Sequence, residues 1–315
     1  MDPDSPRDHL TTEQRNPVSA ELDRLGAAEA FDLFQEEDER AARAVAAARS
    51  EVVAAIELIA GRLRRGGRLF YLGAGTSGRL AVLDAAECPP TFQSDPELVQ
   101  GILAGGEAAL TRAVEGAEDS PELARAALEQ RGLGPDDAVF GITAGGTTAF
   151  VHGGLELARE RGAATVFLAC VPRGQVADRA DVSIRLDTGP ELLAGSTRLK
   201  AGTATKLVLN RVSTLVMVAL GKVYGNLMVD VDTRANRKLT QRGLSILAAL
   251  TGLPREACAP LLERAGGAVK VAAVMHAAGV DAAAARRRLE ACGGSLRRAL
   301  EGGARAGGGE GGSTA

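Results

Sequence analysis

Hydrophobic and polar residues follow a helical pattern first and then a mixed one. From 27 to 64 apolar residues recur at helical spacing, with Glu and Arg between them, which predicts one or two amphipathic helices. Beyond this point short apolar runs alternate with helical patterns. Alternation of this kind predicts a parallel sheet covered by helices on both faces, a doubly wound α/β fold. The expected strands are 68–72, 138–142, 164–170 and 182–186.

The expected helices fall between and after these strands. The helix after the first strand is expected to stop at Cys88-Pro89-Pro90, because proline removes an amide donor and clashes with the preceding turn. No strand is expected after Gly195. The other predicted helices cover 106–131, 150–161, 200–221, 232–250, 255–265, 268–278, 281–291 and 294–301.

The chain divides into four parts on this pattern. We predict an N-terminal arm and helix at 1–50, a ligand-binding α/β domain at 51–250, a small helical bundle at 251–301 and a disordered glycine-rich tail at 302–315.

Composition and charge exclude several classes of protein. A net charge of −3 gives no electrostatic footprint for nucleic acid or for anionic lipid. The most apolar stretch, 207–220, is interrupted by polar residues and too short to span a bilayer, so it predicts a buried helix. The polar, acidic start does not look like a signal peptide, which favours a cytoplasmic protein.

Cysteine and histidine positions offer no metal site. The four cysteines contain no CxxC pair, and the three histidines add no ligand spacing. We therefore expect reduced thiols and no bound metal.

Two glycine-rich loops follow predicted strands: Gly73-Ala-Gly-Thr-Ser-Gly78 and Thr143-Ala-Gly-Gly-Thr-Thr148. A loop between a parallel strand and a helix presents free backbone N–H groups and a positive dipole end, which together suit an anion. Both loops carry hydroxyls. The alternative is that they are tight turns with capping hydroxyls and no ligand.

A dinucleotide is the rival ligand, because the first loop matches G-x-G-x-x-G. That fingerprint also requires a second strand with an acidic residue at its end, about 20 residues on. The region after Asp84 contains two prolines and no strand-like apolar run, and Asp95 lies on no predicted strand. No GxxxxGK[ST] motif is present either. These patterns argue against a nucleotide.

A third loop, 195–203, precedes the long helix and concentrates two cations and three hydroxyls. It is either a solvated helix start or a third surface facing the ligand. The other two loops favour the second interpretation.

Several long blocks resemble one known family. They are YLGAGTSGRLAVLDAAECPPTF (71–92), GILAGGEAALTRAVEGAED (101–119), GSTRLKAGTATKLVLN (195–210) and GKVYGNLMVDV (221–231), with TTEQRNPVSAELDRL (11–25) at the start. They are similar to the signature blocks of N-acetylmuramic acid 6-phosphate etherases, over roughly residues 11–300. The resemblance implies a sugar isomerase (SIS) fold and a cytoplasmic homodimer without metal or organic cofactor. It also implies that a sugar phosphate and water give N-acetylglucosamine 6-phosphate and D-lactate, in recycling of cell-wall amino sugar.

One block departs from the family pattern. Where the family usually reads Ala-Ser-Gly-Arg-Thr-Pro-Tyr, residues 144–150 read Ala-Gly-Gly-Thr-Thr-Ala-Phe. Gly145 replaces the serine and so removes a hydroxyl, and Thr147 replaces the arginine and so removes a cation. The threonine hydroxyls of the loop can compensate for part of these lost contacts. The departure bears on affinity or sugar preference more than on reaction type.

The resemblance also assigns site residues. Glu87 is expected to protonate the departing lactate oxygen, and Glu118 to remove the proton at C2; the identities are firmer than the division of roles. From spacing alone, Glu87 could be an exposed helix end, and Glu118 could belong to a solvated acidic helix face. The expected substrate contacts are Gly75, Thr76, Ser77, Gly78, Arg79, Thr143, Gly145, Gly146, Thr147, Thr148, Ser196, Thr197, Arg198 and Lys200.

Other functions remain as alternatives. A non-catalytic sugar-phosphate sensor would keep the loops and dispense with the two glutamates, which are both present. A SIS-type transcription regulator would need a helix-turn-helix and a basic face, which residues 1–60 lack. An aldose–ketose isomerase would lack the ECPPTF and EGAED blocks.

Overall fold

The structure is a computed structural model that describes residues 8–302. It contains two compact units, one of residues 8–87 and 95–216 and one of residues 88–94 and 217–302. The boundary predicted at 250/251 thus lies inside the second unit. Almost all of the tail predicted at 302–315 lies outside the described residues.

A five-stranded parallel sheet forms the centre of the first unit, in the order β2-β1-β3-β4-β5. The predicted doubly wound α/β fold is confirmed, and four strands lie where the apolar runs placed them. The strands are β1 Leu69–Gly73, β2 Val99–Leu103, β3 Ala138–Thr143, β4 Ala164–Ala169 and β5 Val182–Arg185.

Strand β2 was not expected. Its presence removes one argument against a dinucleotide, namely that no second strand follows the first glycine loop. A second strand does follow the first glycine loop, and it pairs with β1 in parallel. No acidic residue stands at its end, because Leu103 is followed by Ala104-Gly-Gly. The ribose-binding part of the fingerprint is therefore still missing.

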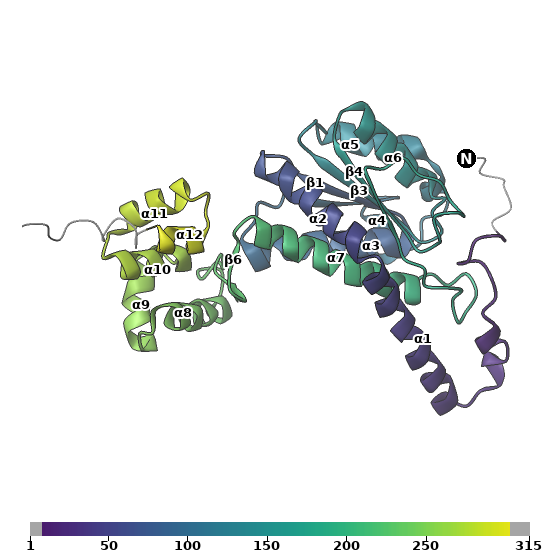
Figure 1. Cartoon of the computed structure of the whole chain (residues 1–315), viewed down its shortest axis with the longest axis horizontal. Coiled ribbons are helices and arrows are strands. Elements are labelled where there is room, and N and C mark those ends of the chain that lie inside the picture. Colours follow the sequence, from purple (N-terminus) through teal and green to yellow (C-terminus); the bar gives the residue numbers. More distant parts are fainter. Residues whose placement is uncertain (1–7, 303–315) are drawn as a thin grey trace, which may run out of the picture. The chain divides into compact units, whose positions relative to one another are not determined.

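Helices cover both faces of this sheet, with α5 and α6 on one face and α2, α3 and α7 on the other (Figure 1). The Lys206 ammonium on α7 donates to the Asp84 carboxylate on α3 at 3.0 Å and so links these two helices. The helices of this part are α1 Ala27–Ala47, α2 Arg49–Arg64, α3 Gly75–Phe92, α4 Ala108–Thr111, α5 Pro121–Gln130, α6 Ala149–Glu160 and α7 Lys200–Ala219, with short 3₁₀ turns η1 Pro17–Ser19, η2 Leu22–Arg24 and η3 Ala117–Asp119.

Two helix predictions were wrong. Helix α3 runs through both prolines and ends at Phe92, so that Pro89 and Pro90 lie in its last turn and the helix stops shortly after the missing amide donors. Residues 106–131 do not form one helix but α4, η3 and α5, since Gly116 adopts a left-handed φ of 74° and Pro121 begins a new helix.

The N-terminal arm packs into the first unit. Leu10 is buried in the core between the sheet and α6, and Thr12 is fully buried. The backbone N–H of Thr11 donates to Gln175 at 3.0 Å, and Gln175 donates back to the Thr11 hydroxyl at 2.7 Å. The arm is thus part of the folded unit.

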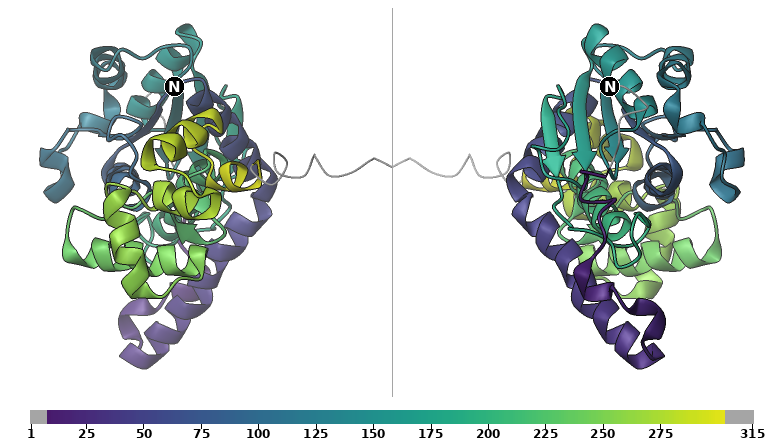
Figure 2. Two further views of the ribbon diagram at one scale, coloured as in Figure 1. Left: turned by 90° about the vertical axis from the view of Figure 1, so that its left-hand side faces the viewer. Right: turned by 90° about the vertical axis from the view of Figure 1, so that its right-hand side faces the viewer.

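Helix α1 is packed only over its C-terminal half. Its buried residues are Glu37, Ala41, Ala44 and Val45. The N-terminal half projects away from the sheet in both views of Figure 2, and its Phe31 is 67% exposed.

The second unit is helical, as predicted, with one short hairpin that was not. The hairpin strands are β6 Val223–Tyr224 and β7 Leu227–Met228, and the helices are α8 Arg237–Thr251, α9 Arg255–Arg264, α10 Val269–Ala278, α11 Ala282–Ala291 and α12 Leu296–Glu301. Lys270 on α10 is buried and donates to Asp230 and to the carbonyls of Gly221 and Gly294. Within residues 8–302, no helix has the length and hydropathy needed to span a membrane.

Candidate functional site

The first two glycine loops lie at the point where the sheet reverses its winding. The chain leaves β1 for α3 on one face of the sheet and leaves β3 for α6 on the other, and β1 and β3 are neighbours. In open parallel sheets a ligand crevice forms at this switch point, beyond the carboxyl ends of the strands. The topology therefore brings the predicted loops 73–78 and 143–148 to one edge.

Glycines in the first loop allow the strand and the helix to approach each other closely. A Cβ at Gly78 would lie 2.4 Å from the Gly73 carbonyl oxygen, and one at Gly73 would lie 2.7 Å from the Gly78 nitrogen. The spacing of these glycines is thus explained by strand–helix packing, without a nucleotide. Among the described residues, the side chains of Thr76 and Ser77 have no hydrogen-bond partner, and both are only partly buried. They remain open to a ligand.

The second loop is held by its own hydroxyls and by α6. The Thr143 and Thr148 hydroxyls lie 2.8 Å apart, and the Gly146 N–H donates to the Thr143 hydroxyl at 3.2 Å. His152 on α6 donates from its Nε2 to the Gly146 carbonyl at 2.7 Å and packs on Phe167. These contacts fix the loop, and among the described residues the hydroxyl of half-buried Thr147 has no hydrogen-bond partner.

Replacing each glycine of this loop with alanine should give opposite results. Gly146 has a φ of +83°, and a Cβ there would lie 3.1 Å from Val176, so Gly146→Ala is expected to cost about 1–2 kcal/mol of unfolding free energy. Gly145 has no positive φ, and its nearest neighbour would be Thr12 at 3.4 Å, so Gly145→Ala should leave stability unchanged. Urea denaturation of both variants checks this. Equal stabilities would contradict the described loop conformation.

The third loop joins the first at the start of α7. A Cβ at Gly202 would lie 3.4 Å from the Thr76 side chain, which places this end of α7 beside the first loop. Among the described residues no partner is found for the side chains of Ser196, Thr197 and Arg198, and Arg198 is exposed. The start of α7, which directly follows these three residues in the sequence, therefore lies beside the first glycine loop.

Lys200, another expected substrate contact, makes its contacts within the chain. Its side chain is buried, and its ammonium pairs with Glu37 of α1 and donates to the Pro190 carbonyl at 2.8 Å. These contacts link α1 to the third loop.

Arg79 is also engaged within the chain. Its Nε donates to the Leu110 carbonyl and its Nη2 to the Arg112 carbonyl, both at 3.1 Å. These bonds tie α3 to the segment that leads to η3. Arg79 therefore positions that segment.

The two predicted catalytic carboxylates are exposed in the single chain. Glu87 lies on α3 about two turns after Arg79, and Glu118 lies in η3. Neighbouring Ala117 is buried in the core, which anchors η3 against the unit. The acidic segment around Glu118 is a short 3₁₀ turn rather than the helix face that spacing suggested, and Arg79 connects it to the helix of Glu87.

Sequence reasoning missed two buried carboxylates that shape the third loop. Glu191 accepts hydrogen bonds from the backbone N–H groups of Lys200 and Ala201 and is 1% exposed. Glu37 is 4% exposed and pairs with Lys200. A signal for Glu37 did exist, since it stands one turn before Ala41 on the apolar stripe of α1. Glu191 carried no local signal.

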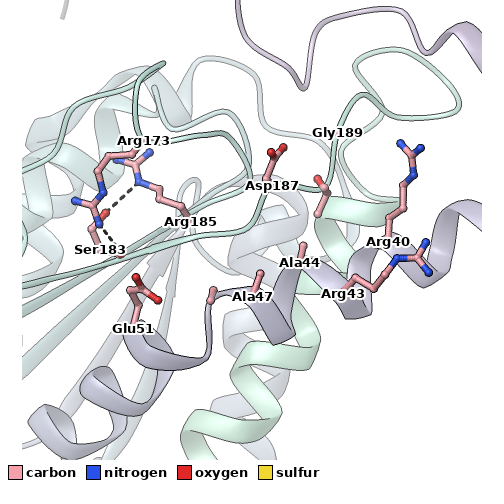
Figure 3. Close-up of a pocket in the computed structure, with 12 residues that line it drawn as sticks. Arg40, Arg43, Ala44, Ala47, Glu51, Arg173, Ser183, Arg185, Asp187 and Gly189 are labelled. Carbon is pink, nitrogen blue, oxygen red and sulfur yellow. Dashed lines mark hydrogen bonds between the residues drawn. The ribbon is translucent and has the colours of Figure 1, made fainter.

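A cavity of about 620 Å³ lies away from the predicted site, between α1, α2 and the connections around β5 (Figure 3). None of its lining residues belongs to the predicted site. Its arginines are largely engaged: Arg40 pairs with Glu37, Arg43 with Glu39 and Arg185 with Asp178. We assign it no ligand.

Cysteines and metal-type clusters add no chemistry in the described part of the chain. The four cysteines are free thiols, and burial raises the pKa of the Cys170 thiol to about 12, so that it stays protonated. No group of three or more His, Cys, Asp or Glu side chains within residues 8–302 is arranged to hold a metal ion.

Comparison with known proteins gives full-length relatives. A protein of Trichormus variabilis named N-acetylmuramic acid 6-phosphate etherase is 60% identical over 294 residues, 93% of this chain and 95% of that protein. One of the same name from Gloeobacter violaceus is 59% identical over 295 residues, 94% of this chain and 96% of that protein. The family described as Glucokinase regulatory protein N-terminal SIS domain matches residues 51–159. Among solved structures, a phosphoheptose isomerase from Neisseria gonorrhoeae is 19% identical with a TM-score of 0.46, covering 60% of this chain and 97% of that chain.

Proposed function

This chain belongs to the N-acetylmuramic acid 6-phosphate etherase family, and from that membership we propose that it cleaves the D-lactyl ether of N-acetylmuramic acid 6-phosphate. The products are N-acetylglucosamine 6-phosphate and D-lactate. The observation that carries the proposal is the match to relatives of that name over nearly the whole chain. The grouped loops at the sheet's switch point support it, because they leave hydroxyls free for a polar ligand.

The chemistry follows from the position of the ether. In the open-chain sugar the ether at C3 lies β to the C1 aldehyde, which acidifies the C2 proton. A base removes that proton, the bond between C3 and the lactyl oxygen breaks, and an acid protonates the departing oxygen. Water then adds to C3. We assign Glu87 as the acid and Glu118 as the base.

The phosphate is assigned to the first two loops. The start of α3 combines a positive dipole end with the hydroxyls of Thr76 and Ser77, and the second loop adds the Thr147 hydroxyl. The resemblance adds Gly75, Gly78, Gly145 and Gly146 as backbone contacts. Arg198 is the exposed cation of the third loop and suits the lactyl carboxylate or the developing enolate.

We further propose that the chain acts as a homodimer in the cytoplasm. The projecting half of α1 with its exposed Phe31 offers a contact surface, and a second subunit would shield the exposed carboxylates from water. Free thiols suit a reducing compartment. Light scattering tests the dimer by the mass of the particle.

The proposed reaction is tested with purified protein and N-acetylmuramic acid 6-phosphate. D-Lactate should be released. In D₂O, deuterium should appear at C2 of the sugar product, and in H₂¹⁸O the heavy oxygen should appear at C3 of the sugar and not in lactate. Heavy oxygen in lactate would show that the other C–O bond breaks. Binding of the sugar phosphate without any lactate release would favour the sensor.

A further inference from the structure

The carboxylate of Glu191 closes the segment from Glu191 to Lys200, which contains the first half of the third loop. Its Oε2 accepts the Lys200 N–H at 3.0 Å and its Oε1 accepts the Ala201 N–H at 2.9 Å. Helices leave their first N–H groups without intrahelical partners, and a residue next to the helix usually caps them. Here the cap comes from nine residues upstream, so the same two bonds that cap α7 also close the segment between Glu191 and Lys200 into a ring.

A second set of contacts fastens the same segment to the arm and to α1. The Lys200 ammonium and the Asn16 side-chain amide both donate to the Pro190 carbonyl, at 2.8 and 3.0 Å. The Ser19 hydroxyl donates to the Leu192 carbonyl at 2.7 Å. The base of the loop is therefore fixed on both sides, and only the stretch between Leu193 and Leu199 extends outward.

That outward stretch carries the three side chains left open to a ligand, Ser196, Thr197 and Arg198. Its internal bonds are local: the Ser196 N–H donates to the Leu193 carbonyl at 2.9 Å, the Thr197 N–H to the Gly195 carbonyl at 3.0 Å and the Leu199 N–H to the Ser196 carbonyl at 3.2 Å. Since α7 starts beside Thr76, the angle of this stretch decides how these side chains face the first loop.

The occupied helix start has a chemical consequence. Because the Glu191 carboxylate already takes the first N–H groups of α7, these groups are not available for a substrate anion. Burial raises the pKa of Glu191, and the bonds from the two backbone N–H groups act against that rise. The dipole of α7 thus serves to hold the loop, and substrate anions must use the loop's own side chains.

We propose that Glu191 is a positioning residue for substrate binding, which acts by holding the loop of Ser196, Thr197 and Arg198 against the first glycine loop. The inference rests on the proposed function for the identity of the substrate. Its effect should appear mainly in binding, because Glu191 reaches no reacting atom.

Glu191→Gln tests this, since glutamine keeps the shape but offers a single acceptor oxygen for two N–H donors. We expect KM for N-acetylmuramic acid 6-phosphate, and Kd for N-acetylglucosamine 6-phosphate by calorimetry, to rise between about tenfold and a hundredfold, with a smaller change in kcat. Asp187→Asn is the matched control, because Asp187 is an exposed carboxylate on the same connection. It should behave like the wild type.

A second variant separates positioning from helix stability. Adding Leu199→Asp to Glu191→Gln supplies a cap from the residue directly before α7. This cap does not restore the link between position 191 and the helix. The double variant should regain melting temperature while KM and Kd stay raised. If binding recovers together with stability, or if folded Glu191→Gln binds as the wild type does, Glu191 is only a cap and the inference is wrong. Failure of the proposed function alone would look different: the wild type would bind the sugar phosphate and release no lactate.

Discussion

Replacing Glu87 with glutamine is expected to lower the rate of D-lactate release by about 10²–10⁴-fold, because glutamine cannot give a proton to the departing oxygen. Since Glu87 is exposed, the replacement should not disturb folding. A coupled D-lactate assay measures the loss, and calorimetry with N-acetylglucosamine 6-phosphate should show binding close to that of the wild type. Full activity in this variant would assign the acid to another group.

Exchange at C2 distinguishes the two carboxylates. With the base intact, Glu87→Gln should still exchange the C2 proton of the substrate with D₂O, although lactate is not released. Glu118→Gln should lose both exchange and release. The reversed pattern would exchange the two assigned roles. Glu115→Gln is the control, because Glu115 is an exposed carboxylate just before η3 and is assigned no role.

Removing the buried ammonium of Lys200 is expected to give the largest loss of stability. In Lys200→Met the carboxylate of Glu37 stays 4% exposed and loses its closest cation, while Arg40 and Asn16 remain. Breaking a buried pair from one side costs about 3–5 kcal/mol when the remaining charge has no other partner. Because Arg40 and Asn16 still contact Glu37, we expect a loss near the lower end of that range. The midpoint of urea denaturation measures this loss.

Two further variants interpret that result. Adding Glu37→Gln to Lys200→Met removes the buried carboxylate charge that has lost one of its two cations, and should recover part of the stability. Lys238→Met, which removes an exposed ammonium on α8, should have almost no effect. If Lys200→Met keeps wild-type stability and loses only substrate affinity, then Lys200 reaches the substrate and the buried pair does not hold the loop.

The strands were predictable where their apolar runs were continuous. β3 and β4 are buried at every position, and their sequences show it. β2 was missed because Gln100 and Gly101 interrupt its pattern at the edge of the sheet. Gly101 is required by packing, since a Cβ there would lie 2.6 Å from Val82 on α3. A residue selected for a close approach in the folded chain shows no periodicity in the sequence.

The site was predictable only in its outline. Glycines and hydroxyls after strands marked the two first loops, because that local pattern has a local cause. The burial of Lys200 could not be predicted in the same way, because its partner Glu37 lies 163 positions away. No residue near Lys200 in the sequence distinguishes a buried cation from a substrate contact. Glu191 shows the same limit, since its function depends on how the loop folds back.

The docking of the N-terminal arm has a consequence for protein synthesis. Thr11, Asn16 and Ser19 leave the ribosome early, but their partners Gln175, Pro190 and Leu192 are translated more than 160 positions later. At about 5–20 residues per second, the nascent arm waits roughly 10–30 s before it can dock. A transcript truncated before codon 175 would therefore yield a chain whose first segment lacks all three of these partners, and which quality-control proteases can recognise from that end.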